Sequence, residues 1–384
     1  MNVSHRSVVV WGRAFLALAL GASVVGCSLW GGGSDKPKPA DLGPNVPVLG
    51  VRQVWMAKLG PVHNLPLAVQ VQGSQLILAS ADGAVAALDA RTGGEVWRAS
   101  LDTALSAGVG SDGRWSAVVS RDNELIVLDS GREAWRKSLG FQVFTAPLVA
   151  GARVFVLGSD RSVSAFDAKN GAKLWSHTRP GDPLVLRQQG VLLAQGDTLV
   201  VGQSGRLVGM NPDTGTVRWE APIASSRGTN DVERLVELVG PASRIDASVC
   251  VRAFQAAVGC VNTARGTVDW VQKASSGQGV HGTDQALFGT ESNGTVVAWR
   301  RNDGSRMWTS ERLQHRKLTA PLALGRSVVV GDDTGWVHLL SREDGAPLNR
   351  MATDGSAVVA APVVAADTLV VVTRNGGVFA YRPD

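Results

Sequence analysis

The sequence is poor in the residues that build chemical centres. It has three cysteines, no two of them adjacent, and six histidines that are spread through the chain without the spacing of metal ligands or of a nucleophile and its base. We therefore expect no metal site, no catalytic residues and no cofactor. Charged residues make up 18% of the chain, and the basic ones are scattered without interleaved aromatics. This distribution argues against a nucleic-acid partner.

Long hydrophobic runs are also lacking, apart from one near the N-terminus that is too short to span a bilayer. This run, residues 14–25, follows a positively charged start, which is the form of a secretory signal peptide. It ends in Val24-Val25-Gly26-Cys27, the pattern that the lipoprotein signal peptidase cleaves once the cysteine thiol is diacylated. We expect residues 1–26 to be removed and Cys27 to carry lipid, palmitate included. The alternative is an ordinary signal peptide with an accidental cysteine, but no better small-residue cleavage site follows.

The residues after the cysteine predict the cellular location of the protein and a flexible tether. Ser28 and not Asp follows Cys27, and by the sorting rule known for enteric bacteria such a lipoprotein is passed to the outer membrane, facing the periplasm. Residues 31–39 consist of Gly, Ser, Pro and charged residues without apolar periodicity, so we expect a flexible tether over residues 27–50. Residues 51–384 contain no second linker and exceed the usual length of one domain, which favours a repeat architecture.

One short pattern returns at a nearly constant interval: a hydrophobic residue, Asp or Asn, then Gly, then Trp. Two clear copies are Leu88–Trp97 and Phe166–Trp175. Asp or Asn bonds its own backbone and Gly supplies the positive φ at which a chain can reverse, so each copy predicts a hairpin turn. The tryptophan is expected to bury its ring against the next unit. Weaker or shortened copies are Leu128–Trp135, Met210–Trp219, Val261–Trp270, Trp299–Trp308 and, without its tryptophan, Ser341–Asn349.

The residues between these turns alternate in polarity over short stretches, as in Arg153–Asp160 and Ser162–Phe166, which indicates antiparallel strands and not helices. A further strand opens each unit around a small residue and a proline, as in Ala146–Val149. A unit of about 40 residues with four strands is a propeller blade. The chain is therefore predicted to be all-β.

The number of units fixes how the ring closes. Eight residues occupy the tryptophan position: Trp55, Trp97, Trp135, Trp175, Trp219, Trp270, Trp308 and Asn349. The last unit, Ala360–Tyr381, stops after three strands, whereas Gln53–Trp55 is a fourth strand that lacks its first three. We therefore predict an eight-bladed β-propeller of four-stranded antiparallel blades over residues 51–384, with the N-terminal strand covering the open edge of the last blade.

Two local patterns admit more than one interpretation. Cys250 and Cys260 flank a hairpin centred near Gln255 and should face each other on adjacent strands. A disulfide is expected in the oxidising periplasm, and two buried free thiols are the alternative. Residues 331–335, Gly-Asp-Asp-Thr-Gly, look like a carboxylate cluster but align with the expected turn at residues 80–83, so we predict a hairpin turn there.

The Asp-x-x-Thr-Gly-x-x-x-Trp copies resemble the propeller repeats of quinoprotein dehydrogenases, which hold pyrroloquinoline quinone. Those enzymes are longer and carry a vicinal cysteine pair over the cofactor, a calcium site and often a haem module. Here no two cysteines are adjacent and no Cys-x-x-Cys-His motif occurs. The repeat therefore predicts the fold and not the cofactor.

A closer resemblance, over the full length, is to the BamB family of outer membrane protein assembly factors. The lipobox, tether and eight units match, and so does an insertion between Trp219 and Trp270, the longest gap in the series. Its segment Ser226–Leu235 is similar to the family's polar segment ending in Glu-x-Asp-Arg-Leu. This chain departs from the pattern in having Glu233 where the family often has Asp, and Glu237 with Val239 where it carries two acids.

A second segment, Pro183–Arg187, is similar to the Leu-x-Leu-Arg by which BamB proteins hold the periplasmic POTRA domains of BamA. Both segments follow a fourth strand, so both should emerge on one face in neighbouring blades. The resemblance implies one patch with apolar anchors, charged contacts and flanking arginines; its residues are Leu184, Leu186, Arg187, Glu237, Arg227 and Arg234. The alternative is that Leu184 and Leu186 are inward residues of a first strand.

Two functions follow from these patterns. The first is a non-enzymatic scaffold lipoprotein that is anchored in the outer membrane by lipid. It would dock on BamA and other Bam subunits and assist the insertion of outer-membrane proteins, whose unfolded chains are potential clients at its blade edges. The second is a periplasmic oxidoreductase that depends on pyrroloquinoline quinone.

Overall fold

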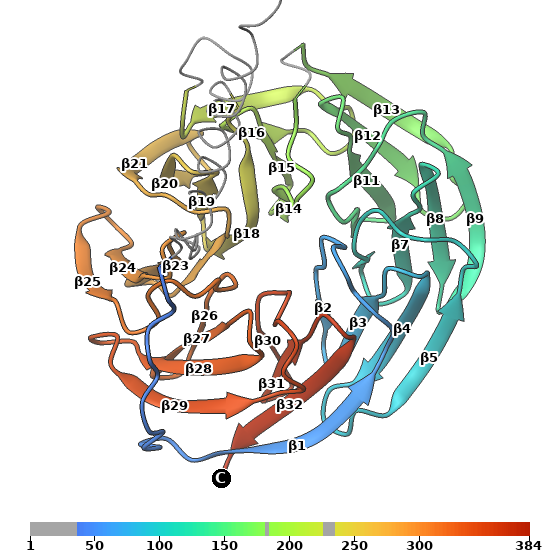
Figure 1. Cartoon of the computed structure of the whole chain (residues 1–384). Coiled ribbons are helices and arrows are strands. Elements are labelled where there is room, and N and C mark those ends of the chain that lie inside the picture. The colour runs from blue at the N-terminus through green and yellow to red at the C-terminus, as the bar shows by residue number, and fades with distance from the viewer. Residues whose placement is uncertain (1–36, 181–183, 226–234) are drawn as a thin grey trace, which may run out of the picture. The chain divides into compact units, whose positions relative to one another are not determined.

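The computed structural model describes residues 37–180, 184–225 and 235–384. Throughout these ranges the regular structure is β, arranged as eight four-stranded antiparallel sheets around a central opening (Figure 1). The predicted eight-bladed propeller is therefore confirmed. We number the blades from the first complete sheet, so that blade 1 is β2–β5 and blade 8 is β30, β31, β32 and β1.

The strands of blades 1 to 4 are β2 (Gln70–Gln72), β3 (Gln75–Ala79), β4 (Ala84–Asp89), β5 (Glu95–Ser100), β6 (Gly110–Ser111), β7 (Trp115–Val119), β8 (Glu124–Asp129), β9 (Arg132–Ser138), β10 (Leu148–Ala150), β11 (Arg153–Leu157), β12 (Ser162–Asp167), β13 (Lys173–Thr178), β14 (Leu192–Gln195), β15 (Thr198–Gln203), β16 (Arg206–Met210) and β17 (Val217–Pro222). Those of blades 5 to 8 are β18 (Leu238–Ile245), β19 (Ser248–Ala253), β20 (Ala257–Asn262), β21 (Thr267–Lys273), β22 (Val280–Gly282), β23 (Ala286–Thr290), β24 (Val296–Arg300), β25 (Arg306–Ser310), β26 (Leu322–Leu324), β27 (Ser327–Gly331), β28 (Trp336–Ser341), β29 (Pro347–Ala352), β30 (Val363–Ala365), β31 (Thr368–Val372), β32 (Gly377–Pro383) and β1 (Val51–Lys58).

The two middle strands of each blade form most of the core. In blade 1, β3 and β4 bury nearly every residue, whereas the outermost strand β5 is largely exposed. This follows from the architecture, because blades pack face to face and a middle strand is covered on both sides by its neighbours. The middle strands are accordingly runs of Val, Leu, Ile and Ala and do not alternate strictly with polar residues.

The repeat motif works as a docking device between blades. In blade 1, Asp89 accepts hydrogen bonds from the backbone amides of Arg91 and Thr92, at 3.0 and 2.9 Å, and Gly93 has a φ of 73°. A Cβ on Gly93 would lie 2.6 Å from the ring of Trp55 in blade 8, so only glycine lets the tryptophan pack there. The same contact joins seven pairs in the described residues: Trp55–Gly93, Trp97–Gly131, Trp135–Gly171, Trp175–Gly215, Trp219–Gly266, Trp270–Gly304 and Trp308–Gly345.

The N-terminal strand closes the ring, as predicted. β1 pairs with β32 from Val51–Pro383 to Lys58–Gly377 and completes the sheet that β30 begins. The residues just before it differ from the expectation. Residues 40–49, assigned to the tether by composition, make hydrogen bonds to blade 7.

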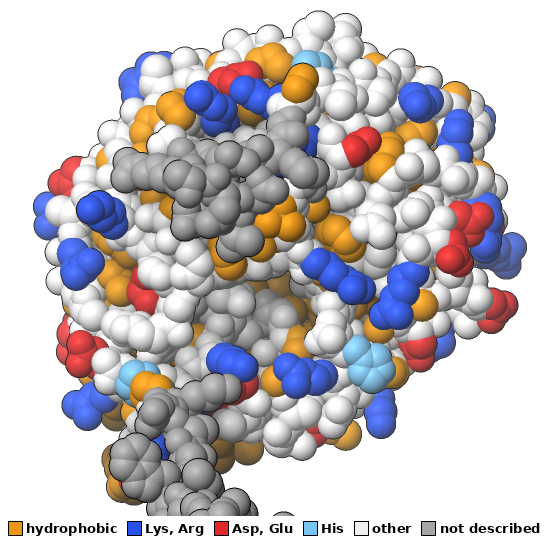
Figure 2. Space-filling model, turned by 45° about the horizontal axis from the view of Figure 1, so that its top comes forward, with side chains coloured by type: hydrophobic (Ala, Val, Ile, Leu, Met, Phe, Trp, Pro, Cys, Tyr) orange, Lys and Arg blue, Asp and Glu red, His pale blue; other side chains and the backbone are white. Residues whose placement is uncertain are grey.

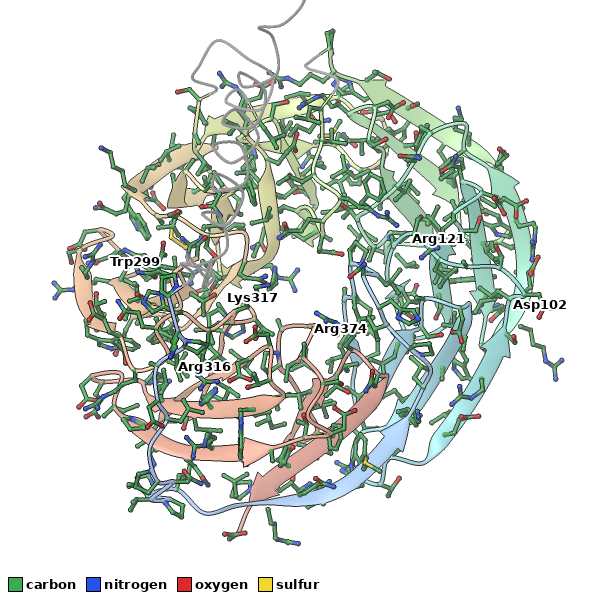
Figure 3. The ribbon with its side chains drawn as sticks, viewed as in Figure 1. Asp102, Arg121, Trp299, Arg316, Lys317 and Arg374 are labelled. Atoms are coloured by element: carbon green, nitrogen blue, oxygen red, sulfur yellow. A yellow bond between two sulfur atoms is a disulfide. The ribbon has the colours of Figure 1, made fainter. Side chains whose placement is uncertain are left out.

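The two faces of the propeller differ in what they carry. Successive strands of a blade run in opposite directions, so the turn between the second and third strands and the connector to the next blade emerge on the same face. We call this the connector face. The other face, which we call the turn face, carries the Asp-Gly turns. Arg121, Lys317 and Arg374 lie on turns and connectors of the connector face, around the central opening (Figure 3).

A buried acid lies in the predicted turn at residues 331–335, which joins β27 to β28. Asp332 is fully buried, and its carboxylate is 3.0 Å from His338 Nε2 and 3.1 Å from Arg316 Nη1. It also accepts hydrogen bonds at 2.9 Å from the amides of Thr334 and Trp336. Burial acts to raise the pKa of Asp332, but the hydrogen bonds of His338, Trp336 and Thr334 outweigh it and lower the pKa to about 2.

This carboxylate makes the stability of the propeller sensitive to acid. Because its pKa is lower in the folded chain than in the unfolded one, where it is 3.8, its contribution to stability is complete above about pH 5 and is lost as the pH falls towards 2. We expect Asp332→Asn to remove this loss, so that unfolding free energy drops less between pH 5 and pH 3 than in wild type, by about 1 kcal/mol. Urea unfolding at the two pH values measures the difference. Equal drops in both proteins would contradict the assignment.

Candidate docking site

The connector from blade 3 to blade 4 carries the first part of the predicted patch. Leu184 is 38% exposed, Arg187 is exposed, and Leu186 is partly buried. None of them lies in a strand, since the first strand of blade 4 begins only at Leu192. The alternative that Leu184 and Leu186 are inward residues of a first strand is therefore wrong.

The last residues of this connector make hydrogen bonds to blade 5 and to the segment that precedes blade 3. Gln189 accepts a hydrogen bond from the Gly240 amide at 2.9 Å, and its side-chain oxygen accepts one from Ala146 at 3.2 Å. The Gly190 amide donates to Thr145 Oγ1 at 2.9 Å, and Gly190 forms an isolated β-bridge with Val239. These bonds join the connector from blade 3 to blade 4 to Val239 and Gly240, at the start of blade 5.

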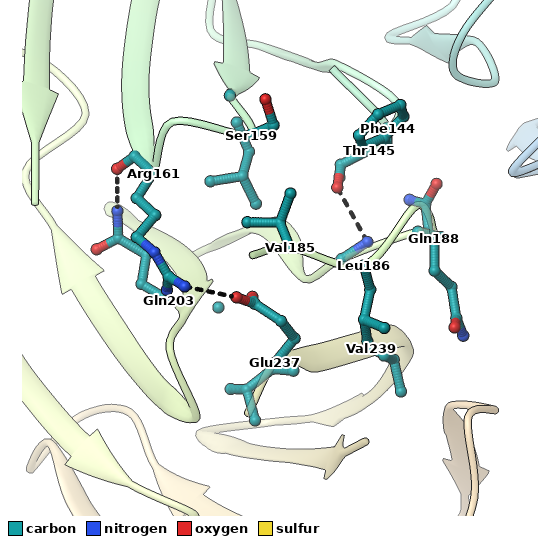
Figure 4. Close-up of a pocket in the computed structure, with 16 residues that line it drawn as sticks. Phe144, Thr145, Ser159, Arg161, Val185, Leu186, Gln188, Gln203, Glu237 and Val239 are labelled. Atoms are coloured by element: carbon teal, nitrogen blue, oxygen red, sulfur yellow. Dashed lines mark hydrogen bonds and ion pairs between the residues drawn. The ribbon is translucent and has the colours of Figure 1, made fainter. Parts of the chain in front are cut away.

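Arg161 holds the two connectors together at their centre (Figure 4). Its guanidinium lies 3.3 Å from the carboxylate of Glu237 and donates to the carbonyl of Leu184 at 3.4 Å and to the hydroxyl of Ser204. Its own carbonyl accepts a hydrogen bond from Gln203 at 2.9 Å. The side chain is buried, so this ion pair is shielded from solvent.

Sequence reasoning did not single out Arg161, although the repeat contains a signal for it. The residue has a φ of 64°, in the left-handed region, at the place where the aligned turns of blades 1 and 7 have Gly83 and Gly335. Blade 2 has Asn123 at this position, with a φ of 62°. Asparagine tolerates the left-handed region better than arginine does, so Arg161 costs backbone strain that persists only when other contacts compensate for it. Its contacts with the two connectors are that compensation.

Glu237 is engaged within the chain and does not reach outward as expected. Its side chain is 17% exposed and pairs with Arg161. Burial raises the pKa of Glu237, and the nearby charge of Arg161 offsets part of the rise. The carboxylate therefore shapes the patch by fixing Arg161, while the exposed charge of the described part belongs to Arg187.

Arg187 stands where the patch meets the central opening. Its guanidinium lies 5.8 Å from the centre of the Phe144 ring, a cation–π contact that orients the side chain without burying it. It also borders the central channel, whose volume is about 650 Å³. Figure 2 shows the hollow at the centre of the propeller with Lys and Arg side chains around it.

A smaller pocket lies beneath the patch, between the two connectors. Phe144, Val185, Leu186, Glu237 and Val239 contribute to its lining, and its volume is about 50 Å³ (Figure 4).

Some predicted site residues lie outside the described part of the chain: Cys27, Arg227 and Arg234. Cys250 and Cys260 are described, and a disulfide joins them across the neighbouring strands β19 and β20, both fully buried. Within residues 37–180, 184–225 and 235–384, no three His, Cys, Asp or Glu side chains gather as they would around a metal ion. The same residues include no helix that could cross a membrane.

Eight four-stranded blades closed into a ring by the N-terminal strand define the class of eight-bladed β-propellers. The family model described as outer membrane protein assembly factor BamB matches residues 81–310. Together with the relatives described next, this match shows that the chain belongs to the BamB family.

Two relatives named outer membrane protein assembly factor BamB resemble the chain over most of its length. The one from Burkholderia pseudomallei is 37% identical and the alignment covers 88% of this chain and 89% of the relative. The one from Bordetella pertussis is 36% identical, with 93% of each chain covered. The crystal structure of BamB from Moraxella catarrhalis has the same fold, with a TM-score of 0.79 at 23% identity over 86% of this chain and 99% of that one.

Proposed function

We propose that this chain is a scaffold subunit of the outer-membrane β-barrel assembly complex and that its connector-face patch docks on the POTRA domains of BamA. The observation that carries the proposal is the joining of two connectors by Arg161 into one surface that presents Leu184 and Arg187 outward. Arginine is one of the residues enriched among interaction hot spots. Other Bam subunits and unfolded outer-membrane proteins are further proposed partners.

Co-purification tests the docking proposal directly. Tagged BamA isolated from detergent-solubilised outer membranes should bring this chain with it in near-stoichiometric amount. A BamA variant that lacks its POTRA domains, folded as judged by its barrel, is the matched control and should not retain the chain. Equal recovery with both forms would place the contact elsewhere.

The second part of the proposal is that the chain is lipid-anchored through Cys27 and faces the periplasm. Two acyl chains give stable membrane attachment where one gives only marginal binding, since each buried methylene contributes about 0.8 kcal/mol. We expect Cys27→Ser to leave the protein soluble in the periplasm or retained as a precursor, with its propeller folded. Fractionation after a high-salt wash measures this. Equal amounts of wild type and variant in the outer-membrane fraction would contradict the lipid anchor.

We further propose that the chain acts by binding and does not catalyse a reaction. The sequence lacks the adjacent cysteines of the quinoprotein enzymes, and the relatives that the chain resembles over most of its length are named assembly factors. Incubation of the purified protein with pyrroloquinoline quinone and calcium should leave the absorbance spectrum equal to the sum of its components. A stable shifted band that survives gel filtration would support the oxidoreductase instead.

A further inference from the structure

Blade 7 departs from the repeat at one position, and the structure shows why. Seven tryptophans pack on the turn glycine of the following blade within the described residues. The eighth position, Asn349 on β29, faces blade 8, whose third and fourth strands are the two ends of the chain, β32 and β1. Those strands are not joined by a turn, so no glycine exists for a tryptophan to pack on.

The residues that precede β1 occupy this seam. Asn349 Nδ2 donates to the carbonyl of Leu49 at 2.7 Å, and its Oδ1 accepts a hydrogen bond from Asn45 at 3.1 Å. The amide of Val48 donates to Leu348 at 2.8 Å. An asparagine side chain has both a donor and an acceptor, which lets one residue hold an extended chain by both of its polar atoms.

The contacts continue along the outside of blade 7 towards the connector face. Arg350 donates to the carbonyls of Leu42 and Gly43 at 3.3 and 3.1 Å. At the connector face, Ala40 exchanges hydrogen bonds with the loop between β25 and β26, its amide donating to Gln314 at 2.9 Å and its carbonyl accepting from Arg316 at 3.1 Å. Figure 1 shows this segment in blue as it crosses β29, and Figure 3 places Arg316 beside it.

Two apolar side chains add packing to these hydrogen bonds. Leu42 packs against the core between blades 6 and 7, and Leu49 against the core between blades 7 and 8. Val46, in contrast, is 71% exposed. The pattern of two inward leucines between exposed residues is that of a segment attached along one side.

We propose that residues 40–49 form a strap that takes the place of the missing tryptophan–glycine contact at the seam between blades 7 and 8. The strap carries the chain from the turn face, where β1 begins, to the connector face, where Ala40 lies. Ala40, the first residue of the strap, therefore lies on the face that bears the docking patch. This last consequence gains its meaning from the proposed function, because that function assigns the docking patch; the strap itself does not depend on it.

Hydrogen exchange of the full-length protein tests the strap without reference to any partner. In wild type, the backbone amides of Ala40, Val48 and Leu49, which donate to the propeller, should exchange at least tenfold more slowly than in an unstructured peptide of that sequence. The double variant Asn349→Ala with Arg350→Ala should lose this protection and unfold at lower temperature. Val46→Ala, which changes an exposed side chain of the same segment, is the matched control and should behave as wild type. Unprotected amides in wild type, or unchanged protection in the double variant, would overturn the proposal.

A second variant distinguishes two explanations for Asn349: that it binds the strap, or that the position merely lost a tryptophan. Asn349→Trp restores the residue of the other seven repeats. If the strap needs the asparagine, the amides of Val48 and Leu49, which lie beside Asn349, should exchange at least tenfold faster than in wild type and the melting temperature should fall. If the position merely lost a useful tryptophan, the variant should be more stable than wild type with its exchange unchanged, and that result would overturn the proposal. Neither measurement involves BamA or the membrane, so failure here leaves the proposed function untouched.

Discussion

Deletion of residues 51–59 is expected to abolish the monomeric propeller and leave a protein that aggregates. These residues contain β1, which pairs with β32 over its whole length and covers an edge that would otherwise be open. An uncovered strand edge is a template for pairing with other chains. The deletion also removes Trp55, which packs on Gly93 and donates a hydrogen bond to the carbonyl of Ala90 at 3.0 Å.

The deletion is expected to be strongly destabilising because it removes several interactions of blade 8 at once. Trp55 is partly buried, so its removal should cost less than the roughly 3–5 kcal/mol typical of a fully buried aromatic side chain. The hydrogen bonds of a whole strand are lost with it. Domains are usually stable by only about 5–15 kcal/mol. Blade 8 should therefore be unable to stay folded, and the ring that depends on it should open.

Size-exclusion chromatography and circular dichroism of the purified protein measure the outcome. A protein that lacks residues 28–36, which precede the propeller and the strap, is the matched control and should elute as a monomer with the melting temperature of wild type. A monomer with wild-type melting temperature after deletion of residues 51–59 would show that β1 is dispensable for ring closure.

Arg187→Glu should weaken binding to the POTRA domains of BamA at least tenfold while leaving the propeller folded. Arg187 is the exposed cation of the described patch, since Arg161 is occupied by Glu237. Reversal of a charge at an interface typically costs about 2–5 kcal/mol when the original contact is desolvated. The melting temperature should hardly move, because the described contact of Arg187 is with the face of Phe144 and exposed substitutions usually change stability by less than about 0.5 kcal/mol.

A pull-down of the isolated POTRA domains with each variant, after circular dichroism has shown native folding, is the decisive measurement. Arg91→Glu is the matched control, because Arg91 is an exposed arginine in a turn of blade 1, on the turn face of the propeller. It should bind as wild type does. Wild-type binding by Arg187→Glu would remove Arg187 from the docking site, and unfolding of that variant would show that the residue is structural.

The repeat made the fold predictable because its evidence is local. Most copies of the motif place an acid or amide and a glycine where a single hairpin turn uses them, as in Asp89 and Gly93, and a tryptophan at a fixed distance after them, as in Trp97. The incomplete last unit and the isolated strand around Trp55 were also visible by comparison with the other copies, so ring closure could be predicted. The pairing of Cys250 with Cys260 likewise follows from one hairpin.

The sequence by itself thus determined the blades, their number and the face on which the two connectors emerge. Only the tertiary structure decided which partners the charged side chains and the N-terminal segment contact. It paired Glu237 with Arg161 and bound Leu49 to Asn349, contacts between residues far apart in the chain. The physical reason is that periodicity and turn chemistry report interactions between near neighbours, whereas an ion pair or a strap depends on which side chains the closed ring brings within reach.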